Sequence, residues 1–251
     1  KPSTQSSPLL YDLTSLQREA NGRFGFSARG TLALAQALYE KHKVLTYPRT
    51  DARALPEDYL ATVRSTLALL SGGGSSKSKA ARKSADKPPT TPYAEFAAEI
   101  LANNWVRPNK RIFDNSKVSD HFAIIPTLQL PKSLSEPEQK LYDLVMRRFL
   151  AVFYPAAESL QTTRITTVER HQFKSEGKVL QKPGWLAVYG REAQADDARL
   201  VPVARGEHPR VGELKLAEEK TRGPARYSEA TLLSAMEGAG KLVEDEELRA
   251  A

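Results

Sequence analysis

One short segment, Lys41 to Arg53, reads KHKVLTYPRTDAR and holds side chains that could cut a nucleic-acid strand. The phenol of Tyr47 could form a phosphodiester with the strand and later release it, because a pKa of about 10 makes it a better leaving group than a serine hydroxyl. Arg49 follows two residues later, and a guanidinium suits the non-bridging oxygens of a phosphate. Alternation in an extended segment puts Tyr47, Arg49 and Asp51 on one side. The spacing predicts a nucleophile beside a phosphate clamp; a basic helix-exit turn is the alternative that spacing alone leaves open.

A second segment, SDHFAIIPT, places Asp120 and His121 directly before an apolar run. A histidinium can donate a hydrogen bond to a phosphate, so His121 is a candidate for holding the scissile group. A structural role for this histidine is the other possibility. The remaining histidines have no comparable setting and are expected on the surface: His42, His171 and His208. Since no acidic pair has convincing divalent-metal spacing, we expect no metal site within this sequence.

The composition bounds the class of protein. The 251 residues carry 37 Lys and Arg against 30 Asp and Glu, a formal charge of +7 that favours a polyanionic partner such as DNA. The absence of cysteine excludes disulfides and thiolate metal sites. Because no apolar run approaches about 18 residues and no signal peptide is visible, we expect a soluble cytoplasmic protein with no membrane partner. The chain starts without methionine and stops inside a helical pattern, so we expect a piece of a longer protein.

The periodicity predicts an α+β fold of more than one domain. An apolar stripe that Asp12 or Thr14 can cap predicts a helix that ends at Asn21-Gly22, and Ser135 with Glu138 predicts a capping box. The expected helices cover residues 13–20, 28–43, 54–70, 92–104, 135–152 and 227–240, and the expected strands cover 44–47, 161–173, 184–190 and 210–220. Residues 71–91 are rich in Gly, Ser and Lys without hydrophobic period, which predicts a flexible basic insertion.

The tyrosine segment also carries a family resemblance. LTYPRTD resembles the active-site signature of type IA DNA topoisomerases, which cut one strand through a 5′-phosphotyrosine. Three further segments resemble the same family in the same order: LTSLQREANGRFGFSA with TLALAQALYE, then SDHFAIIPT, then PARYSEATLLSAMEGAG. YPRTD, AIIPT and MEGAGKL are most similar to the bacterial DNA topoisomerase III branch.

The resemblance implies a role for each matching residue. Tyr47 would attack the scissile phosphate, Arg49 would stabilise the pentavalent transition state, and His121 would contact the phosphate. The residues that would bind DNA or shape its site are Gln36, Glu40, Thr50, Asp51, Arg226, Ser228 and Glu229. The substrate would be DNA, preferably single-stranded, and the full-length enzyme would be a monomer.

The resemblance also implies a domain plan. Residues 1–12 would end a gate-domain strand, and residues 13–132 would form a winged-helix-like domain that carries the active tyrosine. Residues 133–216 would be the second part of the β-rich gate domain, and residues 217–251 would begin a helical DNA-binding domain. The family binds Mg²⁺ through a Toprim domain that precedes the matched region, so we expect no metal within this chain and no complete activity from it alone.

Three other readings remain. The chain could be a non-catalytic, winged-helix-like DNA-binding module, or a structural domain that contacts a partner through its β-rich section. A tyrosine recombinase fits less well, because its catalytic cations lie mostly upstream of a C-terminal tyrosine, whereas Tyr47 comes early in this sequence.

Overall fold

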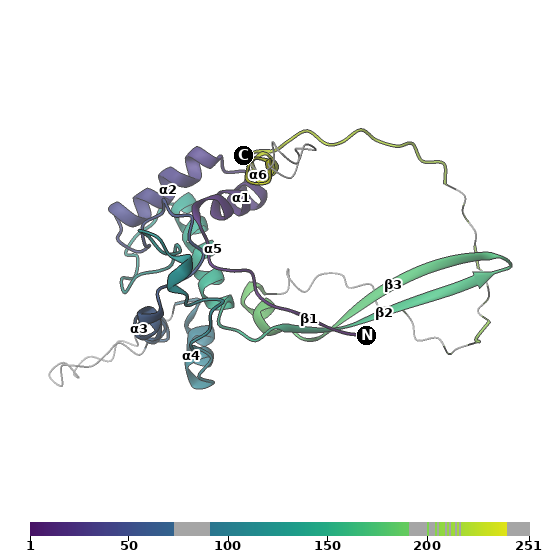
Figure 1. Cartoon of the computed structure of the whole chain (residues 1–251), viewed down its shortest axis with the longest axis horizontal. Coiled ribbons are helices and arrows are strands. Elements are labelled where there is room, and N and C mark those ends of the chain that lie inside the picture. Colours follow the sequence, from purple (N-terminus) through teal and green to yellow (C-terminus); the bar gives the residue numbers. More distant parts are fainter. Residues whose placement is uncertain are drawn as a thin grey trace.

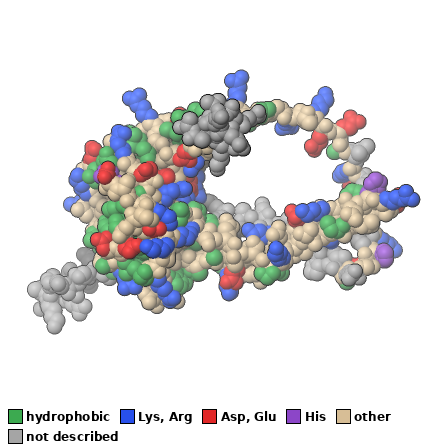
Figure 2. Space-filling view, viewed as in Figure 1, with side chains coloured by type: hydrophobic (Ala, Val, Ile, Leu, Met, Phe, Trp, Pro, Cys, Tyr) green, Lys and Arg blue, Asp and Glu red, His purple; other side chains and the backbone are tan. Residues whose placement is uncertain are grey.

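The structure is a computed structural model, and it describes residues 1–72, 91–190, 200, 204, 206–208, 210, 212–213, 215 and 217–239. Most of the predicted insertion at 71–91, parts of the predicted strand at 210–220 and the end of the predicted domain at 217–251 lie outside these residues. A helical body holds most of the described chain, and a long β-hairpin projects from it (Figure 1). Residues 217–228 lead back to a helix beside the body, and Figure 2 shows an opening between them and the hairpin.

The helical body and its neighbours contain six α-helices within the described residues: α1 (Leu13–Phe24), α2 (Ala28–Glu40), α3 (Leu60–Leu70), α4 (Ala94–Ala102), α5 (Glu136–Ala151) and α6 (Glu229–Glu237). Short 3-10 helices are η1 (Glu57–Tyr59), η2 (Asn115–Lys117) and η3 (Gly184–Tyr189). The strands are β1 (Pro2–Gln5), β2 (Ala157–Val168) and β3 (His171–Lys182). This confirms the predicted α+β class at the level of element content. No helix in the described ranges is long and apolar enough to cross a membrane.

Local signals start the helices as predicted. Asp12 caps α1 by accepting from the Ser15 N–H at 2.7 Å, and Ser135 and Glu138 form the predicted capping box of α5. The predicted end of α1 at Asn21-Gly22 is wrong: the helix runs to Phe24, and Gly25 closes it at φ 68°. Only a residue that tolerates this left-handed conformation ends a helix this way at low cost, so Gly25 is the true stop signal.

The sheet is antiparallel with the order β1-β2-β3. β2 and β3 pair from Glu158↔Lys182 to Val168↔His171, and most of the hairpin is exposed on both faces. Three strand predictions are wrong. The single strand predicted at 161–173 is divided between two strands, because β2 ends at Val168 and the chain turns at Glu169, at φ 53°, into β3. Residues 44–47 make only an isolated bridge, Leu45↔Pro126, because Pro48 follows at once and cannot donate a ladder hydrogen bond.

The predicted strand at 184–190 is instead the 3-10 helix η3. Gly184 adopts φ +50° and a Cβ there would lie 2.5 Å from the carbonyl oxygens of Pro155 and Ala156, so the chain turns at a point where only glycine fits. The turn sends the Trp185 indole N–H to the carbonyl of Gln5 at 2.9 Å, which ties η3 to β1. Among the described residues of 210–220 no strand is present.

One hydrophobic core is built from residues of the five helices α1, α2, α3, α4 and α5 and of η3. Its fully buried members include Leu16 of α1, Leu38 of α2, Ile100 of α4 and Phe149 of α5. The domain plan places a boundary between residues 132 and 133. The core contains residues from both sides of this boundary. The domain limits themselves stay predictions.

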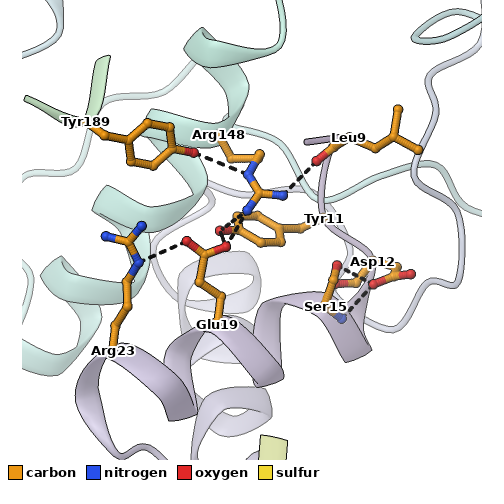
Figure 3. Close-up of polar contacts among 8 residues, drawn as sticks. All are labelled: Leu9, Tyr11, Asp12, Ser15, Glu19, Arg23, Arg148 and Tyr189. Atoms are coloured by element: carbon orange, nitrogen blue, oxygen red, sulfur yellow. Dashed lines mark hydrogen bonds and ion pairs between the residues drawn. The ribbon is translucent and has the colours of Figure 1, made fainter. Parts of the chain in front are cut away.

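A polar network lies inside this core (Figure 3). The guanidinium of Arg148 on α5 donates to the Leu9 carbonyl at 2.9 Å and to the Tyr11 hydroxyl at 3.1 Å, and it forms an ion pair with Glu19 of α1. It also lies 4.1 Å from the centre of the Tyr11 ring. Burial raises the pKa of Tyr11 well above its usual range, so this phenol stays a hydrogen-bond donor. The network fixes residues 9–11, which lead from β1 into α1.

Candidate active site

Tyr47 lies on the loop that follows α2, and its half-buried ring contacts two other rings. The His121 ring centre is 4.3 Å away with an interplanar angle of 43°, and the Tyr39 ring centre is 5.4 Å away at 78°, an edge-to-face contact. The structure therefore brings together two predicted site residues, Tyr47 and His121, that are 74 positions apart in the sequence.

Two threonine hydroxyls hold the tyrosine loop against the histidine segment. Thr46 Oγ1 donates to the Ala123 carbonyl at 3.0 Å and accepts from the Ile125 N–H at 2.9 Å. Thr50 Oγ1 donates to the His121 carbonyl at 3.2 Å. These bonds flank Tyr47 to Arg49 on both sides, so the loop has little freedom to slide past His121.

The end of α2 sets where this loop starts. The Val44 N–H donates to the Leu38 carbonyl at 2.9 Å, and Lys43 adopts φ 59°, which reverses the chain directly after the helix. The Lys43 side chain folds back until its Nζ is 5.5 Å from the centre of the Tyr39 ring. The predicted end of this helix at residue 43 is three residues too late, since α2 stops at Glu40.

Arg49 and Asp51 are exposed on the same loop. Within the described residues neither side chain has an ion pair or a hydrogen bond, so Asp51 makes no contact that orients Arg49. The nearest ion pair on the loop joins Arg53 Nε to Asp12 at 3.5 Å. The exposed guanidinium of Arg49, two residues after Tyr47, can bind an anionic ligand from solvent.

The predicted DNA-contact residues fall into three places. Gln36 is half-buried and Glu40 exposed on the C-terminal half of α2, on the turns next to Tyr39. Thr50 is buried, with its hydroxyl engaged inside the loop. Its predicted contact with DNA stays a prediction, and the geometry gives it a positioning role.

The third group, Arg226, Ser228 and Glu229, lies at the other end of α2. Ser228 caps α6 by accepting from the Thr231 N–H at 3.2 Å, and the Glu229 carboxylate accepts from the Ala28 N–H at the start of α2. Ala28 and Tyr39 are separated by roughly 16 Å along the helix axis at about 1.5 Å per residue. The structure therefore does not join this group to Tyr47, and Arg226 is exposed.

Sequence reasoning missed Tyr39, Lys43 and Thr46. Tyr39 falls at helical spacing from the apolar residues Leu32, Ala35 and Leu38 of its helix, and nothing in a period of 3.6 residues distinguishes a core tyrosine from one that touches a loop. Thr46 precedes Tyr47 directly, but its two bonds go to residues about 80 positions away, which local patterns do not report.

No group of three or more His, Asp or Glu side chains that could hold a metal ion occurs in the ranges that the structure covers. The Mg²⁺ that the resemblance implies would be held by the Toprim domain of the family, which precedes the matched region. Lys and Arg side chains are spread over the helical body, the hairpin and the returning segment (Figure 2).

Comparison with known proteins gives consistent results. A family model described as DNA topoisomerase matches residues 1–240. The DNA topoisomerase 3 of Bacillus licheniformis is 41% identical over 247 residues, which cover 96% of this chain and 31% of that protein. The DNA topoisomerase 3 of Bacillus subtilis (strain 168) is 40% identical over 248 residues, 96% of this chain and 32% of that protein.

The fold has a solved counterpart. The full-length topoisomerase I of Thermotoga maritima matches with a TM-score of 0.64 and 22% identity over 96% of this chain and 36% of that chain. The present chain spans about a third of the length of the relatives that it matches.

Proposed function

Because this chain belongs to the type IA DNA topoisomerases and is similar to topoisomerase 3 among them, we propose that Tyr47 is the nucleophile that cuts and rejoins one DNA strand. The observation that carries the proposal is the tilted contact of the Tyr47 ring with the His121 ring, 4.3 Å between their centres, on a loop that also exposes Arg49. The protein that contains this chain would relax or decatenate DNA as a monomer, with single-stranded DNA as the preferred substrate.

The proposed reaction conserves the number of phosphodiester bonds. Tyr47 Oη loses its proton and attacks the phosphorus, the bond from phosphorus to the 3′ oxygen breaks, and that oxygen leaves as a hydroxyl. The 5′ phosphate stays on Tyr47 as a phosphotyrosine. Attack of the 3′ hydroxyl on this ester reverses the step and frees Tyr47.

Arg49 and His121 would act on the phosphate during both steps. The fixed cation of Arg49 would stabilise the charge that grows on the non-bridging oxygens, and one such group is worth on the order of 100-fold to 1000-fold in rate. His121, held by its ring contact with Tyr47, would donate to the same phosphate. Because the family completes the cleavage site with its Toprim domain, which precedes the matched region, we expect the isolated chain to bind DNA weakly and to form no adduct.

The test uses a single-stranded oligonucleotide labelled at its 3′ end, because that side of the break stays on the tyrosine. Protein and labelled DNA are incubated with Mg²⁺ and separated under denaturing conditions. The isolated chain should give no labelled protein band. A chimera in which residues 1–240 replace the matching part of the Bacillus subtilis relative should give a strong one.

Tyr47→Phe should abolish the band from the chimera, and Arg49→Ala should reduce it by at least 100-fold. Tyr59→Phe is the matched control, because Tyr59 is a half-buried tyrosine that stacks 4.7 Å from Phe122, the neighbour of His121. A band that survives Tyr47→Phe but disappears with Tyr59→Phe would refute the assignment of the nucleophile.

A further inference from the structure

We infer that Tyr39 is a positioning residue that holds the phenol of Tyr47 in place for attack. The inference rests on the proposed role of Tyr47, but its central claim, that one ring fixes the other, can be measured without any DNA. Tyr39 is not expected to touch the reacting phosphate.

The ring contacts carry the first step. Tyr47 contacts His121 at 4.3 Å and Tyr39 at 5.4 Å, while Tyr39 and His121 make no ring pair with each other. The two neighbours therefore restrain different parts of the Tyr47 ring. The threonine bonds fix the backbone of the loop, but only these two rings oppose rotation of the Tyr47 side chain among the described aromatic residues.

The second step is the difference between the two neighbours. His121 is exposed on a segment with no regular structure, whereas Tyr39 is half-buried on the last turns of α2. Its neighbour Leu38 is fully buried, and the Leu38 carbonyl accepts the N–H that starts the tyrosine loop. Tyr39 is thus held more rigidly than His121. Tyr39 therefore sets the orientation of the Tyr47 ring, and the position of the His121 ring depends on that of Tyr47.

The first experiment reads the contact in the chain itself. The ring of Tyr47 shifts the NMR signal of the His121 Cε1–Hε1 group, which His121→Asn identifies among the four histidines. Tyr47→Leu gives the shift that corresponds to complete loss of the contact. Tyr39→Leu should move the signal by at least half of that amount, and Tyr39→Phe, which keeps the ring, should leave it in place.

The matched control is Phe24→Leu. Phe24 is also half-buried, its ring lies 5.3 Å from that of Phe26, and Lys140 Nζ lies 5.9 Å from its centre, so its surroundings copy those of Tyr39 away from the site. This variant should leave the His121 signal unchanged. If Tyr39→Leu lowers the Tm more than Phe24→Leu does, Tyr39→Met, whose longer unbranched side chain adapts to irregular space, takes its place. An unmoved His121 signal in the Leu or Met variant overturns the inference.

The second experiment asks whether the contact matters for cleavage in the chimera. Misplacement by about 1 Å can slow a reaction by about 100-fold, so Tyr39→Leu should slow single-turnover cleavage by roughly 10-fold to 100-fold. The Kd for single-stranded DNA should stay within 2-fold, since Tyr39 does not hold the strand, and Tyr39→Phe should restore the rate. If Tyr47→Phe leaves cleavage intact, the proposed function fails while the NMR result stands. If Tyr47→Phe is inactive but Tyr39→Leu cleaves at the full rate, the inference fails alone.

Discussion

Arg148 offers the sharpest test of how this fold is held together. Its side chain is 8% exposed, and it joins α5 to Glu19 of α1, to the Leu9 carbonyl and to the Tyr189 hydroxyl of η3 (Figure 3). Burial opposes its charge, but the neighbouring tyrosines and Glu19 more than compensate and raise its pKa. We predict that Arg148→Met is strongly destabilising even though methionine fills most of the space.

The magnitude follows from what the substitution leaves behind. Breaking a buried ion pair by removing one partner costs about 3 to 5 kcal/mol. Glu19 keeps a second partner, Arg23 Nε at 3.0 Å, and its side chain is 19% exposed, so the lower end of that range applies. The Leu9 carbonyl loses its donor, which adds about 1 kcal/mol. The free energy of unfolding should fall by about 4 kcal/mol, which lowers the Tm by about 8 to 16 °C for a chain of this size.

Urea unfolding followed by circular dichroism measures this loss, and the neighbouring arginine supplies the control. Arg147 on the same helix pairs with Asp143 at 2.7 Å, but both side chains are 35% exposed. Arg147→Met should therefore cost less than about 1.5 kcal/mol. In a double-mutant cycle, Arg148→Met with Glu19→Gln should lose about 2 kcal/mol less than the sum of the single losses. Equal losses for Arg147→Met and Arg148→Met would refute the idea that the buried network matters.

Three further predictions concern single residues. Gly184→Ala should cost about 2 to 4 kcal/mol, because it combines a positive φ with a clash against the Pro155 carbonyl, and the fluorescence of Trp185 during urea unfolding should report it. Hydrogen bonds from Ser135, helped by His42, lower the pKa of Glu138 from 4.5 to about 2, so its contribution is complete above pH 4.5 and is lost as the pH falls toward 2. Near the surface this contribution is about 1 to 2 kcal/mol, and the urea midpoint of Glu138→Gln should converge on that of the parent chain below pH 3. Glu169→Gly should slow hydrogen exchange in the β2-β3 hairpin by about 5-fold, because Glu169 sits at φ 53° in its turn.

The helices were the most predictable part of the fold, because their signals are local. The Asp12 and Ser135 caps and the apolar stripe of α5 all lie within a few residues of what they stabilise. The predictions of secondary structure failed where contacts with residues distant in the sequence determine the local conformation. Residues 184–190 have a β-rich composition, yet the clash-free turn at Gly184 and the carbonyl of Gln5 select a 3-10 helix.

The candidate site shows the same difference between local signals and distant contacts. Residue chemistry alone suggested Tyr47 and Arg49 as a pair and His121 as a further candidate. It could not show that His121 lies beside Tyr47, since the bonds from Thr46 and Thr50 span more than 70 positions. Tyr39 could have been suspected from its place one residue before the end of α2, directly ahead of the tyrosine loop. The spacing of Tyr39 also fits the buried face of α2, so hydrophobic periodicity could not distinguish a core residue from one that contacts the tyrosine loop.

The contacts around Tyr47 fix the position of its ring and of its loop. Within the described residues no carboxylate or lysine forms a hydrogen bond with the Tyr47 hydroxyl, and the partners that it does have are rings and a hydrogen-bonded backbone. Such partners fix where the oxygen points. Mutations at Tyr39, Thr46 and Thr50 should therefore slow cleavage, and a full cleavage rate in Thr46→Val would contradict this role.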